Sequence, residues 1–221
     1  MIVIRVIFFD TETTGLDCSC CKIIELAMLT VENGKIVEEY DEFIDIGEPL
    51  DSKITDLTGI SDEMLIEHGV YEDVIADDLK ERMTPGTLMI AHNAQFDLSF
   101  IYFLLKRHFP LEVDDIVENV DWLDTVTVLK DRKKYPHKLV DAVHHYNIDD
   151  VNYHRAIDDT KALYEVTLAM KDERNDLIEY KNLFGFNPKY KISGMEFKFI
   201  KYKPQNFRQG LAPAERILPK R

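Results

Sequence analysis

Short apolar runs separated by polar turns dominate the start of the chain. Ile2–Phe9 is an apolar, β-branched run that ends at an aspartate, and it predicts a buried central strand. Ile23–Val31 predicts a second strand, although an apolar run this short is also compatible with a helix. Asn33-Gly34 is typical of a tight hairpin turn, and Lys35–Ile46 after it predicts a third strand. We therefore expect three neighbouring antiparallel strands, with a loop over Asp10–Cys21.

Helical periodicity follows in the middle of the chain. Tyr71–Met83 carries apolar residues near a 3.6-residue period, and Ser61 before another apolar pair predicts a short capped helix. The other expected elements are helices over Phe96–Arg107, Lys138–Tyr146 and Arg155–Met170 and strands over Thr87–Ala91 and Val120–Leu123. Antiparallel strands followed by alternating helices and strands predict an α/β fold, a mixed sheet flanked by helices.

Composition is ordinary for a soluble globular protein. The 221 residues are 45% apolar and 31% charged, which excludes collagen-like and disordered chains. No apolar run approaches the roughly 18 residues that span a bilayer, and the first ten residues carry no secretory cleavage site. All three cysteines lie within Cys18–Cys21, so they cannot build a disulfide framework. We expect a cytoplasmic protein with no membrane partner.

Charge is distributed unevenly along the chain. The net charge is −14, yet Tyr180–Arg221 has ten basic and two acidic residues, a net charge of +8, which leaves −22 on the rest. We therefore predict a main domain over residues 1–179 and a basic C-terminal extension over residues 180–221, irregular apart from a short hairpin. Such a segment either binds a polyanion or folds back to neutralise an acidic body, and both interpretations stay open.

Two carboxylates stand together where the first strand ends. Asp10 and Glu12 are separated by one residue, so on an extended strand their side chains point to the same face. Neighbouring carboxylates repel each other unless a cation lies between them, and hard oxygen ligands suit Mg²⁺ and Mn²⁺. In isolation, solvated loop acids are the commoner explanation of such a pair.

Two further segments place acids and a histidine near helix starts. In AHNAQFD, Asp97 falls in the first turn of a helix, where the helix dipole favours a carboxylate. In HRAIDD, Asp159 is in phase with an apolar helical stripe, whereas Asp158 is in phase with charged residues. This phase predicts that Asp159 faces the core and Asp158 the solvent. His154 precedes the helix, and each of these residues alone has an ordinary structural explanation.

Together the motifs resemble the DEDD exonuclease superfamily, in its histidine-bearing (DEDDh) branch. FFDTETTGL resembles the first motif, AHNAQFD the second and HRAIDD the third, in the family's order over about residues 1–170. In the tyrosine-bearing branch a tyrosine stands four residues before the last aspartate, where this chain has Arg155, and Tyr153 does not fit that spacing. The resemblance is nearest to the proofreading epsilon subunit of bacterial DNA polymerase III and the exonuclease domain of the Gram-positive replicative polymerase.

The resemblance implies a ribonuclease H-like fold and hydrolysis assisted by two Mg²⁺ or Mn²⁺ ions. It assigns the metal ligands to Asp10, Glu12, Asp97 and Asp159 and the general base to His154, a role suited to the ordinary histidine pKa near 6.5. The implied reaction releases 5′-nucleotides from the 3′ end of DNA, preferably single-stranded, in repair or proofreading. A pocket for the terminal nucleotide is implied around Thr13, Thr14, Gly15, Leu16, His92, Asn93 and Phe96.

Alternatives to a DNA exonuclease stay open. An exoribonuclease that trims RNA 3′ ends shares the catalytic core and differs in how its pocket treats the 2′-hydroxyl. A catalytically silent scaffold with the same fold would show loss of a motif residue, and all five are present here. Besides nucleic acid, a DNA polymerase subunit is the expected partner.

Overall fold

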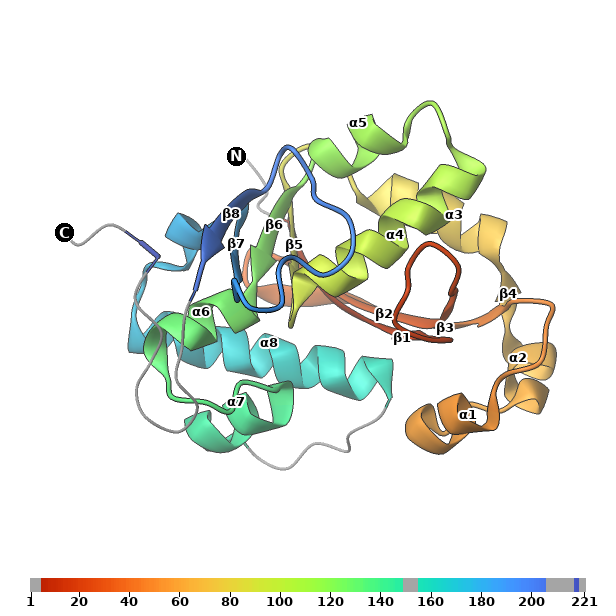
Figure 1. Cartoon of the computed structure of the whole chain (residues 1–221), viewed down its shortest axis with the longest axis horizontal. Coiled ribbons are helices and arrows are strands. Elements are labelled where there is room, and N and C mark those ends of the chain that lie inside the picture. Colours follow the sequence, from red (N-terminus) through yellow and green to blue (C-terminus); the bar gives the residue numbers. More distant parts are fainter. Residues whose placement is uncertain (1–4, 149–154, 206–216, 219–221) are drawn as a thin grey trace.

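A six-stranded mixed sheet forms the centre of the fold, in the order β4-β3-β2-β1-β5-β6 (Figure 1). The computed structural model describes residues 5–148, 155–205 and 217–218. The strands of the sheet are β1 (Arg5–Thr13), β2 (Ile23–Glu32), β3 (Lys35–Asp45), β4 (Val70–Tyr71), β5 (Thr87–Ala91) and β6 (Asp121–Asp124). β1, β2 and β3 are antiparallel neighbours, whereas β5 and β6 continue in parallel from the other side of β1.

Helices cover both faces of this sheet (Figure 1). They are α1 (Ser52–Thr58), α2 (Asp62–His68), α3 (Glu72–Arg82), α4 (Ala94–His108), α5 (Val113–Glu118), α6 (Thr125–Arg132), α7 (Leu139–Tyr146) and α8 (Ala156–Glu173). A short 3₁₀ turn (Leu177–Tyr180) and a small pair of strands, β7 (Leu183–Phe186) and β8 (Lys201–Pro204), complete the elements of the described part. The predicted α/β class with a mixed sheet is therefore confirmed.

β1 is buried on both faces, and its alternation decides where the acids point. Ile7 and Phe9 belong to the core that includes residues of α3 and α4. Phe8 belongs to a second core that includes Leu163 and Val166 of α8. Because strand side chains alternate between faces, Asp10 and Glu12 continue on the α8 side.

Several predicted elements are confirmed, and two need correction. The Asn33-Gly34 turn joins β2 to β3 with both residues at positive φ, and the hydroxyl of Ser61 caps α2. The expected loop over Asp10–Cys21 is wrong at its start, because β1 continues to Thr13 in register with β2. The C-terminal hairpin is also wrong, since β7 and β8 pair in parallel.

The described part of the C-terminal segment packs on the main core. Phe184 and Phe197 are buried within the core that also holds α3 and α4. The Tyr202 hydroxyl donates to Oε1 of Gln95 in α4 (2.7 Å), whereas Tyr190 is 71% exposed. Phe207 lies outside the described residues. The domain boundary at residue 179 stays a prediction. No helix in the described stretches has both the length and the apolar character to cross a membrane.

Candidate active site

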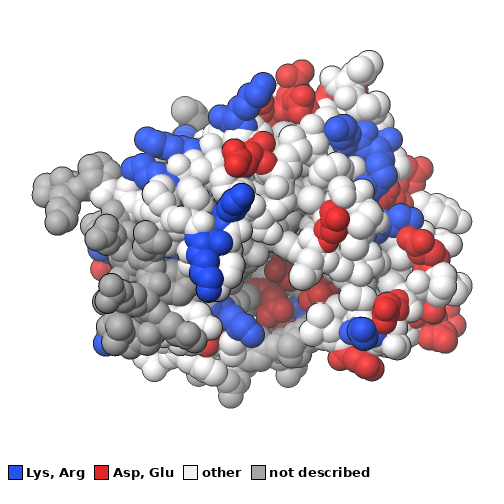
Figure 2. All heavy atoms as spheres, in the orientation of Figure 1, with Lys and Arg blue, Asp and Glu red and all other residues white. Residues whose placement is uncertain are grey.

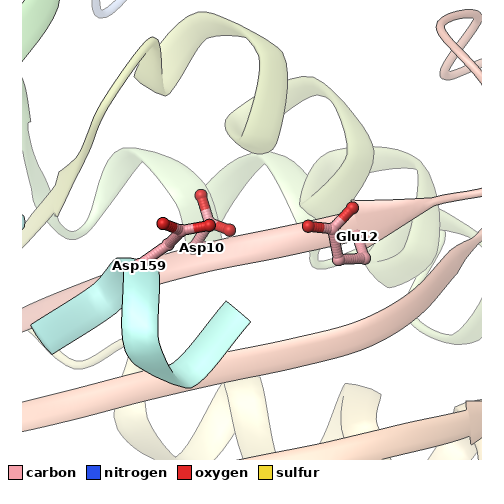
Figure 3. A group of neighbouring side chains, drawn as sticks. All are labelled: Asp10, Glu12 and Asp159. Carbon is pink, nitrogen blue, oxygen red and sulfur yellow. The ribbon is translucent and has the colours of Figure 1, made fainter. Parts of the chain in front are cut away.

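Three carboxylates from two elements meet at the end of β1. Asp10 and Glu12 project from the same face of this strand, and Asp159 projects from the first turn of α8 (Figure 3). One oxygen from each of the three carboxylates lies within 4.8 Å of the others. Ala162, Leu163 and Val166 on the helical stripe of Asp159 are fully or almost fully buried, whereas Asp158 and Asp159 are both half-buried and only Asp159 joins the acidic group.

Burial and the nearness of other carboxylates raise the pKa of Asp10 and of Glu12. Burial, together with the charges of Asp97, Asp159 and Glu12, raises the pKa of Asp10 well above its ordinary value. Burial and the nearby charges of Glu25 and Asp159 raise the pKa of Glu12 to about 7. At neutral pH the cluster therefore holds protons unless a cation replaces them.

The fourth predicted acid, Asp97, stands beside this group. It is 3% exposed in the first turn of α4, and the hydroxyl of Thr11 donates to its Oδ1 (2.7 Å). Burial raises its pKa to about 7, although the Thr11 hydrogen bond acts in the opposite direction. Among the described residues, the group with oxygens within 4.8 Å holds three of the predicted acids, with Asp97 outside it. Its charge nevertheless contributes to the raised pKa of Asp10.

The donor set fits a hard divalent cation. Asp10, Glu12 and Asp159 offer only carboxylate oxygens, which Mg²⁺ and Mn²⁺ prefer over nitrogen or sulfur. A bound cation would also remove the repulsion that raises the pKa of Asp10 and Glu12. These three residues can therefore hold a metal ion, and the role of Asp97 as a further ligand stays a prediction.

A fifth acid, Glu25, fixes the start of the helix that carries Asp159. It is fully buried on β2, directly opposite Glu12 in the strand register. Its Oε1 accepts from Nε of Arg155 (2.8 Å), and its Oε2 accepts from the backbone N–H of Ala156 (3.1 Å). Arg155 is the residue that caps α8, so this ion pair sets the position of the first turn of α8 relative to β1.

The predicted general base, His154, lies outside the described residues. Its neighbour Arg155 is described and is anchored by Glu25, as above. The role of His154 therefore stays a prediction.

The first half of the predicted nucleotide pocket is an ordered turn that follows β1. Thr13 donates through its hydroxyl to the carbonyl of Gly15 (2.7 Å), and the hydroxyl of Thr14 accepts from the N–H of Lys22 (3.0 Å). Leu16 at the turn is 87% exposed, so its side chain is available to a ligand rather than used in the core. Contact of these residues with a nucleotide stays a prediction.

The second half of the predicted pocket precedes and opens α4. Nε2 of His92 donates to the carbonyl of His137 (2.9 Å), and Nδ1 is hydrogen-bonded to the hydroxyl of Thr125 (2.9 Å). Both ring nitrogens are thus used within the protein, and burial lowers the His92 pKa. Asn93 is exposed, with a left-handed backbone (φ 78°), while Phe96 packs partly against the core.

Thr11 and Glu25 support the site, and the sequence alone assigns neither of them a role. Thr11 alternates with the predicted ligands and holds Asp97, and only the known course of β1 shows this. Glu25 is detectable in principle, because a charged residue inside the apolar run Ile23–Val31 needs a buried partner. The identity of that partner, Arg155, depends on tertiary structure.

Removing divalent cations should make stability fall as pH rises. The Glu12 pKa is about 7 in the folded protein against 4.5 ordinarily, so the folded state holds protons that the unfolded chain has released. In EDTA, the free energy of unfolding should therefore decrease between about pH 5 and pH 7 and level off above. Added Mg²⁺ and the variant Glu12→Gln, which removes the titrating group itself, should each flatten this profile. Denaturant unfolding at several pH values measures it, and a flat wild-type profile in EDTA would contradict the prediction.

The Glu25–Arg155 pair should respond asymmetrically to substitution. Arg155→Ala leaves the fully buried Glu25 without its ion-pair partner and should lower the free energy of unfolding, by less than the roughly 3–5 kcal/mol of a pair buried on both sides, because the Arg155 side chain is 41% exposed. Glu25→Gln leaves Arg155, whose side chain is 41% exposed, in contact with water and should cost less. The double variant should then be more stable than Arg155→Ala alone. Equal losses for both single variants in urea unfolding would argue against a buried, uncompensated Glu25 charge.

One protein-family model matches most of this chain. The family described as Exonuclease matches residues 7–167. The PolC-type DNA polymerase III of Bacillus subtilis is 35% identical over 186 residues, which cover 82% of this chain and 12% of the polymerase. The PolC-type enzyme of Lacticaseibacillus paracasei is 33% identical over 167 residues, 76% of this chain and 11% of that enzyme. The chain thus spans about a tenth of the length of these relatives.

Solved structures show the same fold. Exonuclease I of E. coli, in complex with a dA16 oligonucleotide, superposes with a TM-score of 0.70 at 18% identity, covering 80% of this chain and 42% of that one. The complex of the same enzyme with a dT13 oligonucleotide gives a TM-score of 0.68. Since the family match includes Asp10, Glu12, Asp97 and Asp159 and the fold agrees, the chain belongs to the exonuclease family of the DEDD superfamily.

Proposed function

We propose that this chain is a metal-dependent 3′–5′ exonuclease that hydrolyses the terminal phosphodiester bond of DNA and releases 5′-nucleotides. The observation that carries the proposal is the convergence of Asp10, Glu12 and Asp159 within 4.8 Å, with Asp97 beside them. Burial and the charges of Asp97, Asp159 and Glu12 raise the pKa of Asp10, so a cation bound among these acids would favour their ionised form. Family membership makes phosphodiester hydrolysis the matching chemistry.

In this proposal the four acids would hold a divalent cation at the end of β1. A divalent ion bound here supplies Lewis-acid stabilisation of negative charge and lowers the pKa of a water molecule. Asp10 and Glu12 are fixed by β1, and Asp159 is fixed by the Glu25–Arg155 anchor at the start of α8. Thr11 holds the Asp97 carboxylate in one orientation through its 2.7 Å hydrogen bond. The ligands are thus oriented before substrate arrives, which lowers the reorganisation needed during reaction.

His154 accepts the proton of the attacking water in this proposal. The oxygen of that water forms a bond to phosphorus while the bond from phosphorus to the 3′ oxygen of the preceding nucleotide breaks. The leaving 3′ oxygen takes up a proton from solvent and becomes the new 3′-hydroxyl of the preceding strand, and the released nucleotide carries the phosphate on its 5′ side. An imidazole with an ordinary pKa is neutral at physiological pH and suits this proton transfer.

DNA is the proposed substrate because the named relatives act in DNA metabolism. The sequence relatives are DNA polymerases, and E. coli Exonuclease I is described with bound deoxyoligonucleotides. We infer from this a role in repair or proofreading on single-stranded 3′ ends, with a DNA polymerase as partner.

Digestion of matched 3′-labelled substrates tests the proposal. Single-stranded DNA, mispaired duplex DNA and RNA are incubated with Mg²⁺ or Mn²⁺, with EDTA as the control. Release of labelled 5′-nucleotide from DNA, abolished by EDTA, is the expected result. Faster release from RNA would assign the chain as an exoribonuclease, and no release from any substrate would refute catalysis.

Asp159 and its neighbour Asp158 provide a matched pair for the metal site. Asp159→Ala should abolish turnover while the fold survives, because a ligand is lost from the acidic cluster. Asp158→Ala removes the same charge one residue away, outside this cluster, and should keep most activity. Oligonucleotide turnover and circular dichroism are measured together for both variants. An inactive Asp158→Ala beside an active Asp159→Ala would shift the third motif by one residue.

His154→Ala should lower turnover by roughly 10²–10⁴-fold, the usual effect of losing a general base. Wild-type activity should also fall on acidification as this imidazole protonates, so the pH–rate profile of the variant should lose that limb. Mg²⁺ binding, followed calorimetrically, should be largely kept. If the activity of the variant falls as steeply on acidification as that of the wild type, the fall is due to protonation of the carboxylates and not of His154.

A further inference from the structure

Two adjoining hollows lie beside the start of α4. The first, about 190 Å³, runs between the starts of α4 and α6 and the C-terminal segment around Tyr190 and Lys191. The second, about 350 Å³, runs on from it toward Lys138. Both are lined by Asn93, Val126 and Lys130, and the two adjoining hollows are together named the Asn93 groove.

The Asn93 groove is basic although the chain as a whole is acidic. Lys130, Lys138 and Lys191 line it, and the whole chain has a net charge of −14. Asp124 is the one acid among the described lining residues. Its carboxylate is 4% exposed and accepts from the backbone N–H of Asn93 (2.9 Å), so its charge is largely used inside the protein. Lys138 and Lys191 are exposed, so a ligand in this groove meets their positive charge.

Exposed aromatic rings stand among these lysines. Tyr190 is 71% exposed, and Nζ of Lys189 lies 5.0 Å from the centre of its ring. Tyr135 borders the other end of the groove and is 39% exposed. Aromatic rings stack on bases and lysines contact phosphates, a combination typical of surfaces that bind single-stranded nucleic acid without sequence preference.

The groove adjoins the acidic site. Asn93 directly precedes α4, whose first turn carries Asp97, and the charge of Asp124 contributes to the raised pKa of Asp97. Figure 2 shows acidic side chains at the bottom of a central hollow, with Lys or Arg side chains along its left side in that view. A strand lying in the groove would therefore end near the carboxylates.

The outer wall of the groove is firmly attached to the core. Gln95 in α4 donates to the carbonyl of Met195 (2.7 Å) and accepts from the hydroxyl of Tyr202 (2.7 Å). The N–H of Gly185 donates to the hydroxyl of Thr127 in α6 (2.8 Å). This wall lies beyond residues 7–167, the part that matches the exonuclease family, so it is a feature of this chain's C-terminal segment.

We propose that the Asn93 groove binds the single-stranded polynucleotide upstream of the 3′ end that the acidic site cleaves. The inference rests on the proposed function, because hydrolysis from the 3′ end is what makes the strand in the groove the upstream part of the substrate. Binding of that strand can nevertheless be measured without hydrolysis. Lys191 and Lys189 contact phosphates, and Tyr190 stacks on a base. The C-terminal segment thereby supplies the attraction that the acidic body lacks.

Strand binding in EDTA tests the proposal separately from catalysis. The variant Lys189→Ala/Lys191→Ala/Tyr190→Ala changes only exposed side chains. Fluorescence anisotropy of a labelled single-stranded DNA or RNA oligonucleotide should show a Kd raised about tenfold or more, because one stacked base alone is worth about that much. The slope of log Kd against log salt should fall by about 1.4, since each phosphate that a lysine no longer neutralises lowers it by roughly 0.7.

A matched control removes the same groups elsewhere. Lys35→Ala/Lys171→Ala/Tyr71→Ala loses two exposed lysines and a tyrosine that is also 71% exposed, away from the groove. Its Kd should stay near the wild-type value. With Mg²⁺, the groove variant should raise KM for a long strand and leave dinucleotide cleavage unchanged, and the single variant Tyr190→Ala should show a smaller effect in the same direction.

The outcomes separate the groove from the proposed activity. Weaker binding by the groove variant alone supports the groove even if the wild-type protein cleaves nothing. An unchanged Kd, equal weakening in the control, or no binding by the wild-type protein would each overturn the proposal. If the Kd of the groove variant is unchanged, the exposed surface around Tyr190 would be assigned to contact with a partner protein and not with nucleic acid.

Discussion

Repulsion among carboxylates at the end of β1 is the constraint on which the site depends. Asp10, Glu12 and Asp159 lie within 4.8 Å of one another, and burial adds to the energy of ionising them. A fold can retain such a cluster only if rigid elements hold the acids together. β1 does this, because it pairs with strands on both sides and is covered on both faces. The site is thus built on the most constrained element of the sheet.

Secondary contacts convert this crowded cluster into an ordered one. Glu25 would add to the repulsion, since its charge helps to raise the pKa of Glu12, but Arg155 pairs with it. The same pair fixes the start of α8 and with it Asp159. Thr11 orders Asp97 on the other side of the cluster. One arginine and one hydroxyl therefore hold three of the neighbouring acids in a geometry that repulsion alone would disperse.

The C-terminal segment complements the acidic body in two ways. Phe184 and Phe197 fill the same core as α3 and α4, so part of this segment contributes to folding. Lys189, Tyr190 and Lys191 remain exposed beside the Asn93 groove. Part of this segment therefore packs on the core, and polyanion binding stays a proposal for its exposed residues.

The sequence by itself determined the sheet's antiparallel half, the main helices and the acids that meet at the end of β1, because these depend on local periodicity and on motifs short enough to be recognised. Asp159 could be chosen over Asp158 from helical phase alone. The tertiary structure decided what local patterns do not contain. In the structure β1 continues through Glu12, Glu25 pairs with Arg155 although 130 residues separate them, and β7 pairs with β8 in parallel. Each of these depends on contacts between distant segments, and such contacts are set by how the whole core packs.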